Sequence, residues 1–289
     1  MRHYDDELTK SLGVKIIAVD QPGVGKSTNV KNLRNDRTLF NYAKDIEELV
    51  NFLNIDKFAV AGHSGGGPHA LAIAHYIGPT RVVNGVLAAP APPLDEVMIP
   101  GIFETFNFPY AKYIFQFCQY IPFLIYLLCY PIAWWANYDM LNGYIKSVAD
   151  NDRTTGNPET FFGHPKQTQI FYDSFTQGFT QGPAGIQGMF HIALLNRNGW
   201  GFDIRGRDNN IPQHFDIFMS DVDIVMKPEL GQKMCETMSD ATLHIWQNAG
   251  HYSFVDRECW IEFYTTLVKE YNRVREKTTT TKGSDKKEN

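Results

Sequence analysis

The chain has 289 residues, 43% of them hydrophobic and 13% aromatic, a composition typical of a globular protein that can bury a substantial core. Its formal net charge of -5 provides no basic surface for nucleic acid, so we expect no nucleic-acid partner. The four cysteines form no C-x-x-C pair or metal-ligand spacing and are too few for a disulfide framework, so we expect no metal and a reducing compartment. The polar start "MRHYDDELTK" carries no secretory signal in the sequence as given, which predicts a cytoplasmic location.

Residues 14–19, "VKIIAV", are the first predicted strand, because a short apolar, β-branched run bounded by Gly13 and a turn is typical of a buried parallel strand. The turn that follows, "DQPGVGKST", is similar to a phosphate-binding loop, which requires G-x-x-x-x-G-K-[ST]. Asp20 stands in place of the first glycine, and its carboxylate would repel a phosphate. The next ten residues offer only Val30 and Leu33 as apolar positions, so no packed helix follows. We therefore expect a tight turn rather than a nucleotide site, and we predict no cofactor.

Helices and strands alternate in the next part of the chain. Apolar residues at intervals of three and four predict an amphipathic helix over 38–55, and "KFAVAG" at 57–62 predicts a buried strand. A helix over 65–78 carries Pro68 in its first turn, where the missing N–H does no harm. The run "RVVNGVLAAPAP" at 81–92 predicts a strand that ends at prolines. Such alternation is typical of an α/β protein with a mostly parallel sheet flanked by helices.

Residues 94–206 are aromatic-rich and irregular, and they interrupt this pattern. Residues 113–136 carry no charge, which raises the question of a membrane-spanning helix, since a span needs about 20 apolar residues. Pro122 and Pro131 divide the run into pieces too short to span a membrane without kinks. We therefore predict a helical lid over a binding cleft, with peripheral membrane contact through residues 113–136 as an alternative.

The core resumes after this insert. The runs "HFDIFM" and "ATLHIW" predict two further strands, and "CWIEFYTTLVKEYNRV" predicts an amphipathic helix. The last residues, "KTTTTKGSDKKEN", contain no apolar side chain and are expected to form a disordered tail. The predicted organisation is a core in two parts, 1–93 and 207–276, with a lid at 94–206 and a tail at 277–289.

The stretch "FAVAGHSGGGPHALAIA" carries the most specific motif in the chain. Gly62-His63-Ser64-Gly65-Gly66 matches G-x-S-x-G, with a predicted strand directly before it and a predicted helix directly after it. Glycines two before and two after the serine let the strand and the helix approach closely, so the hydroxyl stands on a sharp turn at the edge of the sheet. The Gly65 N–H, at the helix N-terminus, is then placed to donate to an oxyanion. The alternative is a glycine-rich turn with an unreactive serine.

A serine nucleophile needs a general base, and the base needs an acid that orients it. We favour His251 among the nine histidines, because "NAGHYSF" follows a predicted strand at the carboxyl end of the sheet, where ligands bind in open α/β folds. The loop "SDVDIVMKP" after the preceding strand offers Asp221 and Asp223. Only one of these two carboxylates is expected to meet the imidazole, and either one could instead be a solvated turn residue.

These motifs resemble the α/β-hydrolase superfamily, in particular its esterase and peptidase-like branch of serine hydrolases with a lid insert, over Arg2 to about Lys269. The turn "DQPGVGKS" is similar to the family pattern D-x-P-G-x-G-x-S, "GHSGGG" to the family's elbow, and "GHYSF" to its histidine loop. Aligning the acid motif G-x-x-D-x-x-V-P selects Asp223 over Asp221, although the glycine, valine and proline of that motif are replaced here.

The resemblance implies a serine hydrolase that cleaves an ester, and less readily an amide, of a small molecule with an apolar part. Ser64 would attack, His251 would carry the proton, Asp223 would orient the histidine, and the Gly65 N–H would stabilise the oxyanion. The alternative function is that of a catalytically inactive relative or fragment that acts as a binding module.

One part of the family's fold has no counterpart in this sequence. In the family, about three strands precede the one predicted at 14–19, and the loop after the third strand supplies a second oxyanion donor. That third strand lies between the fourth and the fifth in the family's sheet. The sequence therefore resembles an N-terminally truncated α/β-hydrolase, and we expect either a longer product or neighbouring strands that have closed up.

Overall fold

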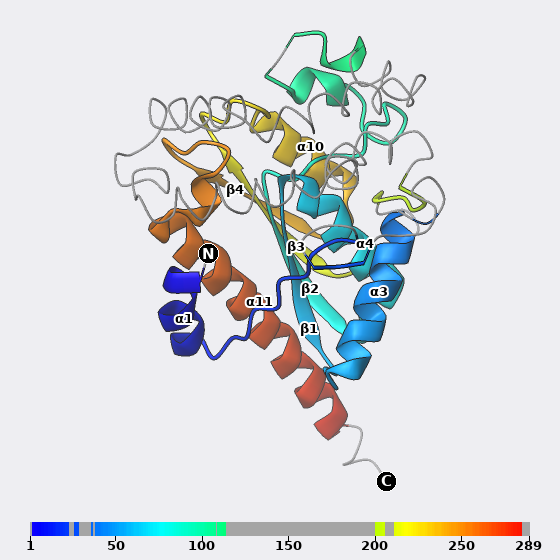
Figure 1. Ribbon diagram of the computed structural model, residues 1–289, viewed down its shortest axis with the longest axis vertical. Helices are drawn as coiled ribbons and strands as arrows, with labels where there is room; N and C mark the ends of the chain where they lie inside the picture. The colour runs from blue at the N-terminus through cyan, green and yellow to red at the C-terminus, as the bar shows by residue number, and fades with distance from the viewer. Residues whose placement is uncertain are drawn as a thin grey trace.

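The computed structural model describes residues 2–22, 26–28, 36, 38–107, 109–113, 200–205 and 211–284. Its centre is a parallel sheet whose four strands lie in the order β1-β2-β3-β4. The strands are β1 (Phe58–His63), β2 (Val82–Ala88), β3 (His214–Ser220) and β4 (Ala241–Trp246). Because all four strands run in the same direction, the loops that follow their carboxyl ends meet at one edge of the sheet (Figure 1).

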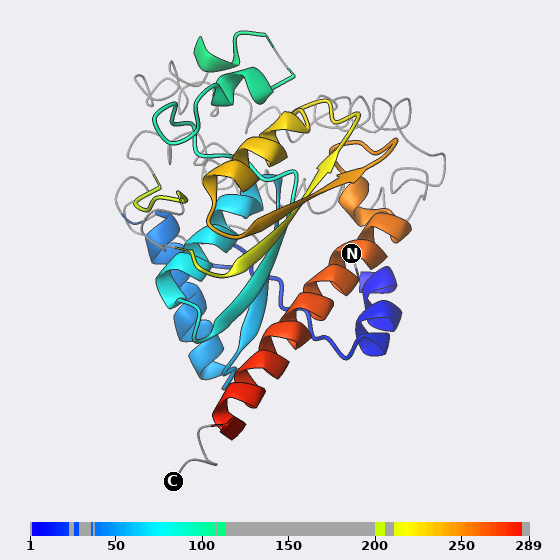
Figure 2. The same cartoon turned by 180° about the vertical axis from the view of Figure 1, so that it is seen from behind.

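Helices cover both faces of this sheet (Figures 1 and 2). On one face, α3 (Leu39–Phe52) and α4 (Gly67–Ile77) share a hydrophobic core with the strands, and α10 (Glu229–Thr237), which joins β3 to β4, adds to the same core. On the other face, α11 (Arg257–Ser284) forms a second apolar cluster. α1 (Arg2–Ser11) lies beside α11 in both views, and this arrangement makes three layers.

Buried polar side chains join these layers. Asn84 in β2 donates from Nδ2 to the carbonyl oxygen of Leu267 in α11 at 3.0 Å. Gln213, just before β3, donates from Nε2 to the carbonyl oxygen of Ala74 in α4 at 2.9 Å. Both side chains are almost fully buried, so breaking either bond would leave a polar group unpaired at a cost of about 1–3 kcal/mol.

The structure confirms the predicted α/β architecture. The helices predicted over 38–55 and 65–78 are α3 and α4, and the strands predicted at 57–62 and 81–92 are β1 and β2. The two strands predicted after the insert are β3 and β4, and the closing helix is α11. The helix α10, a short amphipathic segment between these two strands, was not predicted.

The strand predicted at residues 14–19 is wrong. These residues are extended, but no described strand pairs with them, and Ile16, Ile17 and Val19 are 37%, 40% and 37% exposed. β-branched residues favour a strand only where a neighbour supplies backbone hydrogen bonds and a face to bury. Within the described residues β1 lies at the edge of the sheet, so the sheet has not closed up onto this segment, which Figure 1 draws as a thin tube in front of β1.

The predicted disordered tail is wrong for residues 277–284, because α11 continues to Ser284. Once the packed turns of a helix have formed, each further residue adds a hydrogen bond without a new nucleation cost, so the helix can extend into a polar segment. Residues 285–289 lie outside the described residues.

Most of the lid predicted at 94–206 lies outside the described residues, including 114–199. Near its two ends, Ile102 and Trp200 are buried in the same hydrophobic core as α3 and α4. The lid itself and the membrane contact predicted for 113–136 therefore stay predictions. In the part of the chain that the structure describes, no helix combines the length and the apolar character needed to cross a membrane.

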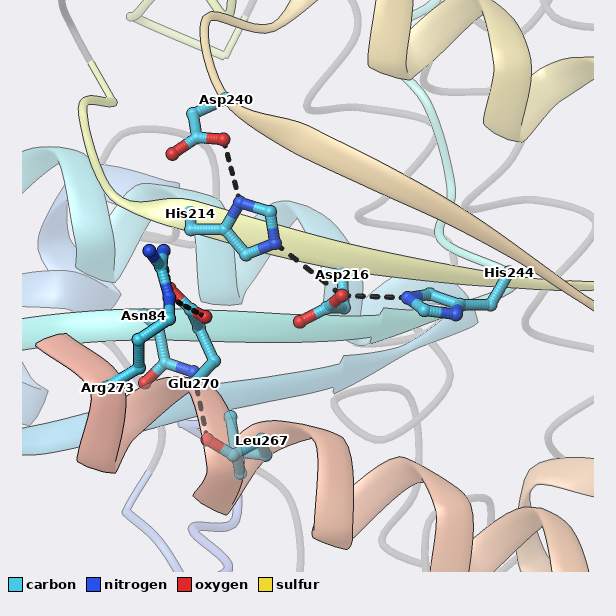
Figure 3. A network of polar contacts seen from close by, with 8 residues as sticks. All are labelled: Asn84, His214, Asp216, Asp240, His244, Leu267, Glu270 and Arg273. Atoms are coloured by element: carbon cyan, nitrogen blue, oxygen red, sulfur yellow. Dashed lines mark hydrogen bonds and ion pairs between the residues drawn. The ribbon is translucent and has the colours of Figure 1, made fainter.

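A polar network lies on β3 and β4 close to α11 (Figure 3). Asp216, buried in β3, accepts from His244 Nε2 at 2.7 Å and pairs with His214 Nε2 at 3.5 Å. His214 Nδ1 also donates to Asp240 at 2.7 Å. The hydrogen bond to Asp216 outweighs burial and raises the pKa of His214 to about 9. Burial acts to raise the pKa of Asp216, but the bonds from His214 and His244 outweigh it and lower that pKa to about 2.

We expect the His214–Asp216 pair to make stability depend on pH. A histidine whose pKa rises from 6.5 to about 9 on folding stabilises the fold fully below pH 6.5, and this contribution is lost as the pH rises through 9. The pair is partly solvated, so we expect a loss of roughly 1–2 kcal/mol in the free energy of unfolding. Urea denaturation should show His214→Asn to be less stable than the wild type near pH 6, and the two proteins should converge above pH 9. A difference that stays constant across this range would contradict the prediction.

Candidate active site

Ser64 lies on the turn between β1 and α4. β1 ends at His63, a short 3-10 helix spans Ser64–Gly66, and α4 begins at Gly67. The φ angle of Ser64 is 49°, in the left-handed region that residues other than glycine rarely adopt. The N–H of Ala91 holds the Ser64 carbonyl oxygen at 2.8 Å. A strained turn of this kind is what presents the serine hydroxyl in a nucleophile elbow.

Two glycines of this turn leave no room for a side chain. A Cβ at Gly62 would lie 2.6 Å from the carbonyl oxygen of Gly66, and a Cβ at Gly67 would lie 2.6 Å from the Cβ of Pro90. At Gly66, the last glycine of the motif, an added Cβ would meet nothing within 4 Å. The close approach of strand and helix therefore depends on Gly62 and Gly67, and the prediction that it also needs Gly66 is wrong.

We expect Gly67→Ala to destabilise the protein and Gly66→Ala to be tolerated. The new methyl at Gly67 overlaps Pro90, and such overpacking costs about 1–3 kcal/mol. Gly66 has φ -77° and open space around it, so alanine there changes stability by less than about 1 kcal/mol. Thermal melting of the two variants measures the difference. Equal melting temperatures would show that the contact with Pro90 does not limit this turn.

His251 links Ser64 to a buried carboxylate. Its Nε2 lies 3.1 Å from the Ser64 Oγ, and its Nδ1 lies 2.7 Å from the Asp223 Oδ2. The exposed fractions of His251 and Asp223 are 4% and 3%. An Nδ1–H that donates to the carboxylate leaves Nε2 free to accept a proton from the serine. The structure thus brings the three predicted residues together beyond the carboxyl ends of β1, β3 and β4.

Backbone hydrogen bonds determine which of the two candidate aspartates faces His251. The Asp223 Oδ1 accepts from two backbone N–H groups of its own loop at 2.6 and 3.0 Å, which leaves Oδ2 for the imidazole. Asn107 also donates to the Asp223 carbonyl oxygen. The Asp221 Oδ1 instead accepts from the Ala249 N–H at 3.1 Å. Asp223 therefore meets the imidazole, whereas Asp221 ties the acid loop to the backbone of the histidine loop.

The loop that carries His251 is held by two contacts that were not predicted. The Ser253 Oγ accepts from the Gly250 N–H at 2.9 Å. His63 donates from Nε2 to the carbonyl oxygen of His251 at 2.8 Å. The G-x-S-x-G motif contains His63, but no signal in a single sequence shows that its partner is a backbone atom of a distant loop.

Other described histidines lie elsewhere. His69 donates from Nδ1 to the Gly65 carbonyl oxygen at 3.0 Å, and His75 stacks on a phenylalanine ring at the far end of α4. His214 and His244 share the carboxylate of the polar network described above. These contacts agree with the choice of His251, rather than one of these other histidines, as the base that pairs with Ser64.

Thiol chemistry at the two described cysteines is disfavoured. Burial raises the pKa of Cys235 to about 11 and that of Cys259 to about 12. Both thiols are therefore protonated near neutral pH, the form in which a thiol is a poor nucleophile. Among the described residues no group of three histidine, cysteine or acidic side chains is placed to hold a metal ion.

Ser27, which the similarity to a phosphate loop includes, is among the described residues that follow 14–19. The Ser27 hydroxyl donates to the Asp20 carbonyl oxygen at 3.0 Å. In a phosphate loop the hydroxyl at this position would bind a metal-nucleotide complex. Burial, followed by the negative charges of Asp45 and Asp20, raises the pKa of Tyr42 in α3 to about 12.

Comparison with known proteins defines the class of the chain. A family model described as the alpha/beta hydrolase fold matches residues 2–258, and the chain belongs to this family. No curated protein sequence matches the chain.

Solved structures of esterases share the fold. An esterase from Rhodococcus sp. ECU1013 is 16% identical, with 93% of this chain and 86% of that chain covered and a TM-score of 0.59. A thermophilic esterase from Thermogutta terrifontis is also 16% identical, with 93% and 84% covered and a TM-score of 0.60. An esterase from Exiguobacterium antarcticum is 19% identical, with 92% and 87% covered and a TM-score of 0.61. At these identities the likeness shows the fold alone.

Proposed function

We propose that this protein is a serine hydrolase that cleaves a carboxylic ester, and less readily an amide, through an acyl-enzyme intermediate. The observation that carries the proposal is the pair of hydrogen bonds made by His251, 3.1 Å to the Ser64 Oγ and 2.7 Å to the Asp223 Oδ2. Membership of the α/β-hydrolase family supports the same class of enzyme.

The proposed reaction moves one proton back and forth through His251. The Ser64 oxygen attacks the ester carbonyl carbon while its proton passes to the His251 Nε2. Asp223 stabilises the imidazolium, and the Gly65 N–H donates to the oxyanion. When the tetrahedral intermediate collapses, the bond to the alcohol oxygen breaks and the alcohol takes the proton from His251. Water then attacks the acyl-enzyme with His251 as base, the carboxylic acid leaves, and the Ser64 oxygen regains its hydrogen.

The proposed substrate is a small molecule with an apolar acyl or alcohol part. Two observations motivate this preference. Residues 113–136 of the predicted lid are rich in aromatic and aliphatic side chains. Val222 and Ile224, next to Asp223 in sequence, are apolar side chains that are 36% and 39% exposed, and ligand pockets are lined mostly by apolar side chains.

A fluorophosphonate probe tests the nucleophile, because it reacts with serines that a neighbouring base activates. We expect the native protein to be labelled and Ser64→Ala to remain unlabelled, since the reacting oxygen is removed. Labelling that persists in Ser64→Ala would assign the reaction to another residue. A folded wild-type protein that does not label would favour the inactive binding module.

We expect the two aspartates to differ sharply in their effect on turnover. Asp223→Asn cannot hold the Nδ1–H of His251 in the required tautomer, so kcat should fall by about 10⁴-fold. Asp221→Asn keeps an oxygen for the Ala249 N–H and should change kcat by less than about tenfold. Hydrolysis of p-nitrophenyl acetate measures both variants. A larger loss of kcat in Asp221→Asn than in Asp223→Asn would contradict this prediction, because it would show that Asp221 orients His251.

A further inference from the structure

His63 connects the residue before the nucleophile to the loop that carries the base. Its Nε2 lies 2.8 Å from the carbonyl oxygen of His251. A carbonyl oxygen can only accept, so the proton of this bond is on Nε2. Burial, followed by the charge of the nearby His251, lowers the pKa of His63 to about 3. The ring is therefore neutral near pH 7, and its Nδ1 carries no proton.

The ring of His63 also packs against the same loop. It stacks on Phe254, with the centroids 3.9 Å apart and the planes at 19°. The centroids of the His251 and Tyr252 rings lie 5.1 and 5.8 Å from it. One side chain thus contacts the histidine loop both through a polar donor and through an aromatic face. A shift of the loop would disturb both contacts.

The position of His63 in the chain connects these contacts with the reacting groups. It is the last residue of β1, and Ser64 follows it directly, so the anchor and the nucleophile share one strained turn. The bond from His63 holds the backbone of His251, whereas the bond to Asp223 holds its imidazole. Two bonds at opposite ends of one residue set both its position and its orientation.

We propose that His63 is a positioning residue that holds the His251 imidazole at reacting distance from Ser64 by binding the His251 carbonyl. This inference rests on the proposed function, because it concerns the rate of the reaction assigned to Ser64. A neutral ring at this place also puts no second positive charge beside the imidazolium that forms on His251. A displacement of about 1 Å at a reacting group costs about 10²-fold in rate, so loss of the anchor should be visible although His63 itself does not react.

Two variants of His63 distinguish the effect of its N–H donor from that of its ring, and a third variant is a control. His63→Phe keeps the stacking on Phe254 and removes the donor. His63→Gln keeps an N–H at a similar reach and removes the ring. His75→Phe is the matched control, because His75 is also a histidine stacked on a phenylalanine but lies at the far end of α4.

We expect His63→Phe to react with the fluorophosphonate about 10- to 100-fold more slowly than the wild type. His63→Gln should regain most of the rate, and His75→Phe should react at the wild-type rate. With p-nitrophenyl acetate the loss should lie in kcat with KM little changed. The acid limb of the pH–rate profile, which reports the base, should move in His63→Phe and return in His63→Gln. A purely structural role would instead lower the melting temperature and leave the pH profile of the folded fraction unchanged.

Wild-type rates in folded His63→Phe would overturn the positioning role, and so would a His63→Gln variant no faster than His63→Phe. Failure of the proposed function has a different signature, since the wild type itself would then not react with the probe. In that case the chemical shift of the His251 Nδ1 proton, measured by NMR, tests the positioning role of His63. The positioning role predicts that this resonance, set by the bond to Asp223, moves in His63→Phe, and an unchanged resonance overturns it.

Discussion

The parallel pairing of the four strands is the constraint on which the site depends. Pairing across the sheet places the following residues in one row: His63, Ala88, Phe218 and His244. Beyond this row the chain leaves the sheet at the same edge, into Ser64 and into the loops of Asp223 and His251. Ser64 and His251 are 187 residues apart in sequence, yet they are within hydrogen-bond distance. A slip of one residue in the pairing of β3 or β4 would turn the side chains of that strand to the opposite face of the sheet. It would also separate Asp223, which follows β3, from His251, which follows β4.

Two of the aspartate–histidine pairs on β3, β4 and the loops that follow them have the same spacing, and comparing them shows what makes one of them a candidate for chemistry. His244 with Asp216 and His251 with Asp223 have the same sequence separation of 28 residues and the same nitrogen–oxygen distance of 2.7 Å. The first pair lies within the strands and meets a second histidine. The second lies beyond the strand ends and meets a hydroxyl on a strained turn. An aspartate–histidine pair is therefore not enough to define a candidate site, and what distinguishes the second pair is the Ser64 hydroxyl 3.1 Å from its imidazole.

Much of the site could be predicted because its signals are local. Ser64 lies in a short motif between an apolar strand and a helix, and His251 follows another apolar strand. The residues alone leave Asp221 and Asp223 open, and the resemblance to the family's acid motif selects Asp223. The physical reason, which is the set of backbone N–H groups that each carboxylate accepts, is visible only in the structure. The partner of His63 is a carbonyl 188 residues away, which no pattern of side chains reveals. The same limit explains the strand predicted at 14–19, since an apolar β-branched run specifies a strand only when the fold supplies a neighbour.

β1 presents one of its sides to no other strand in the described part of the chain. Sheets commonly protect such a side with charged residues, a proline or a covering segment, because unpaired N–H and C=O groups are a template for another chain. The sequence of β1, "FAVAGH", contains no acidic residue, no lysine or arginine and no proline. The irregularity in its register lies in the pairing with β2, which is the other side of the strand. The residues of β1 themselves therefore do nothing to oppose pairing with another strand, and any such protection has to come from the segments around β1.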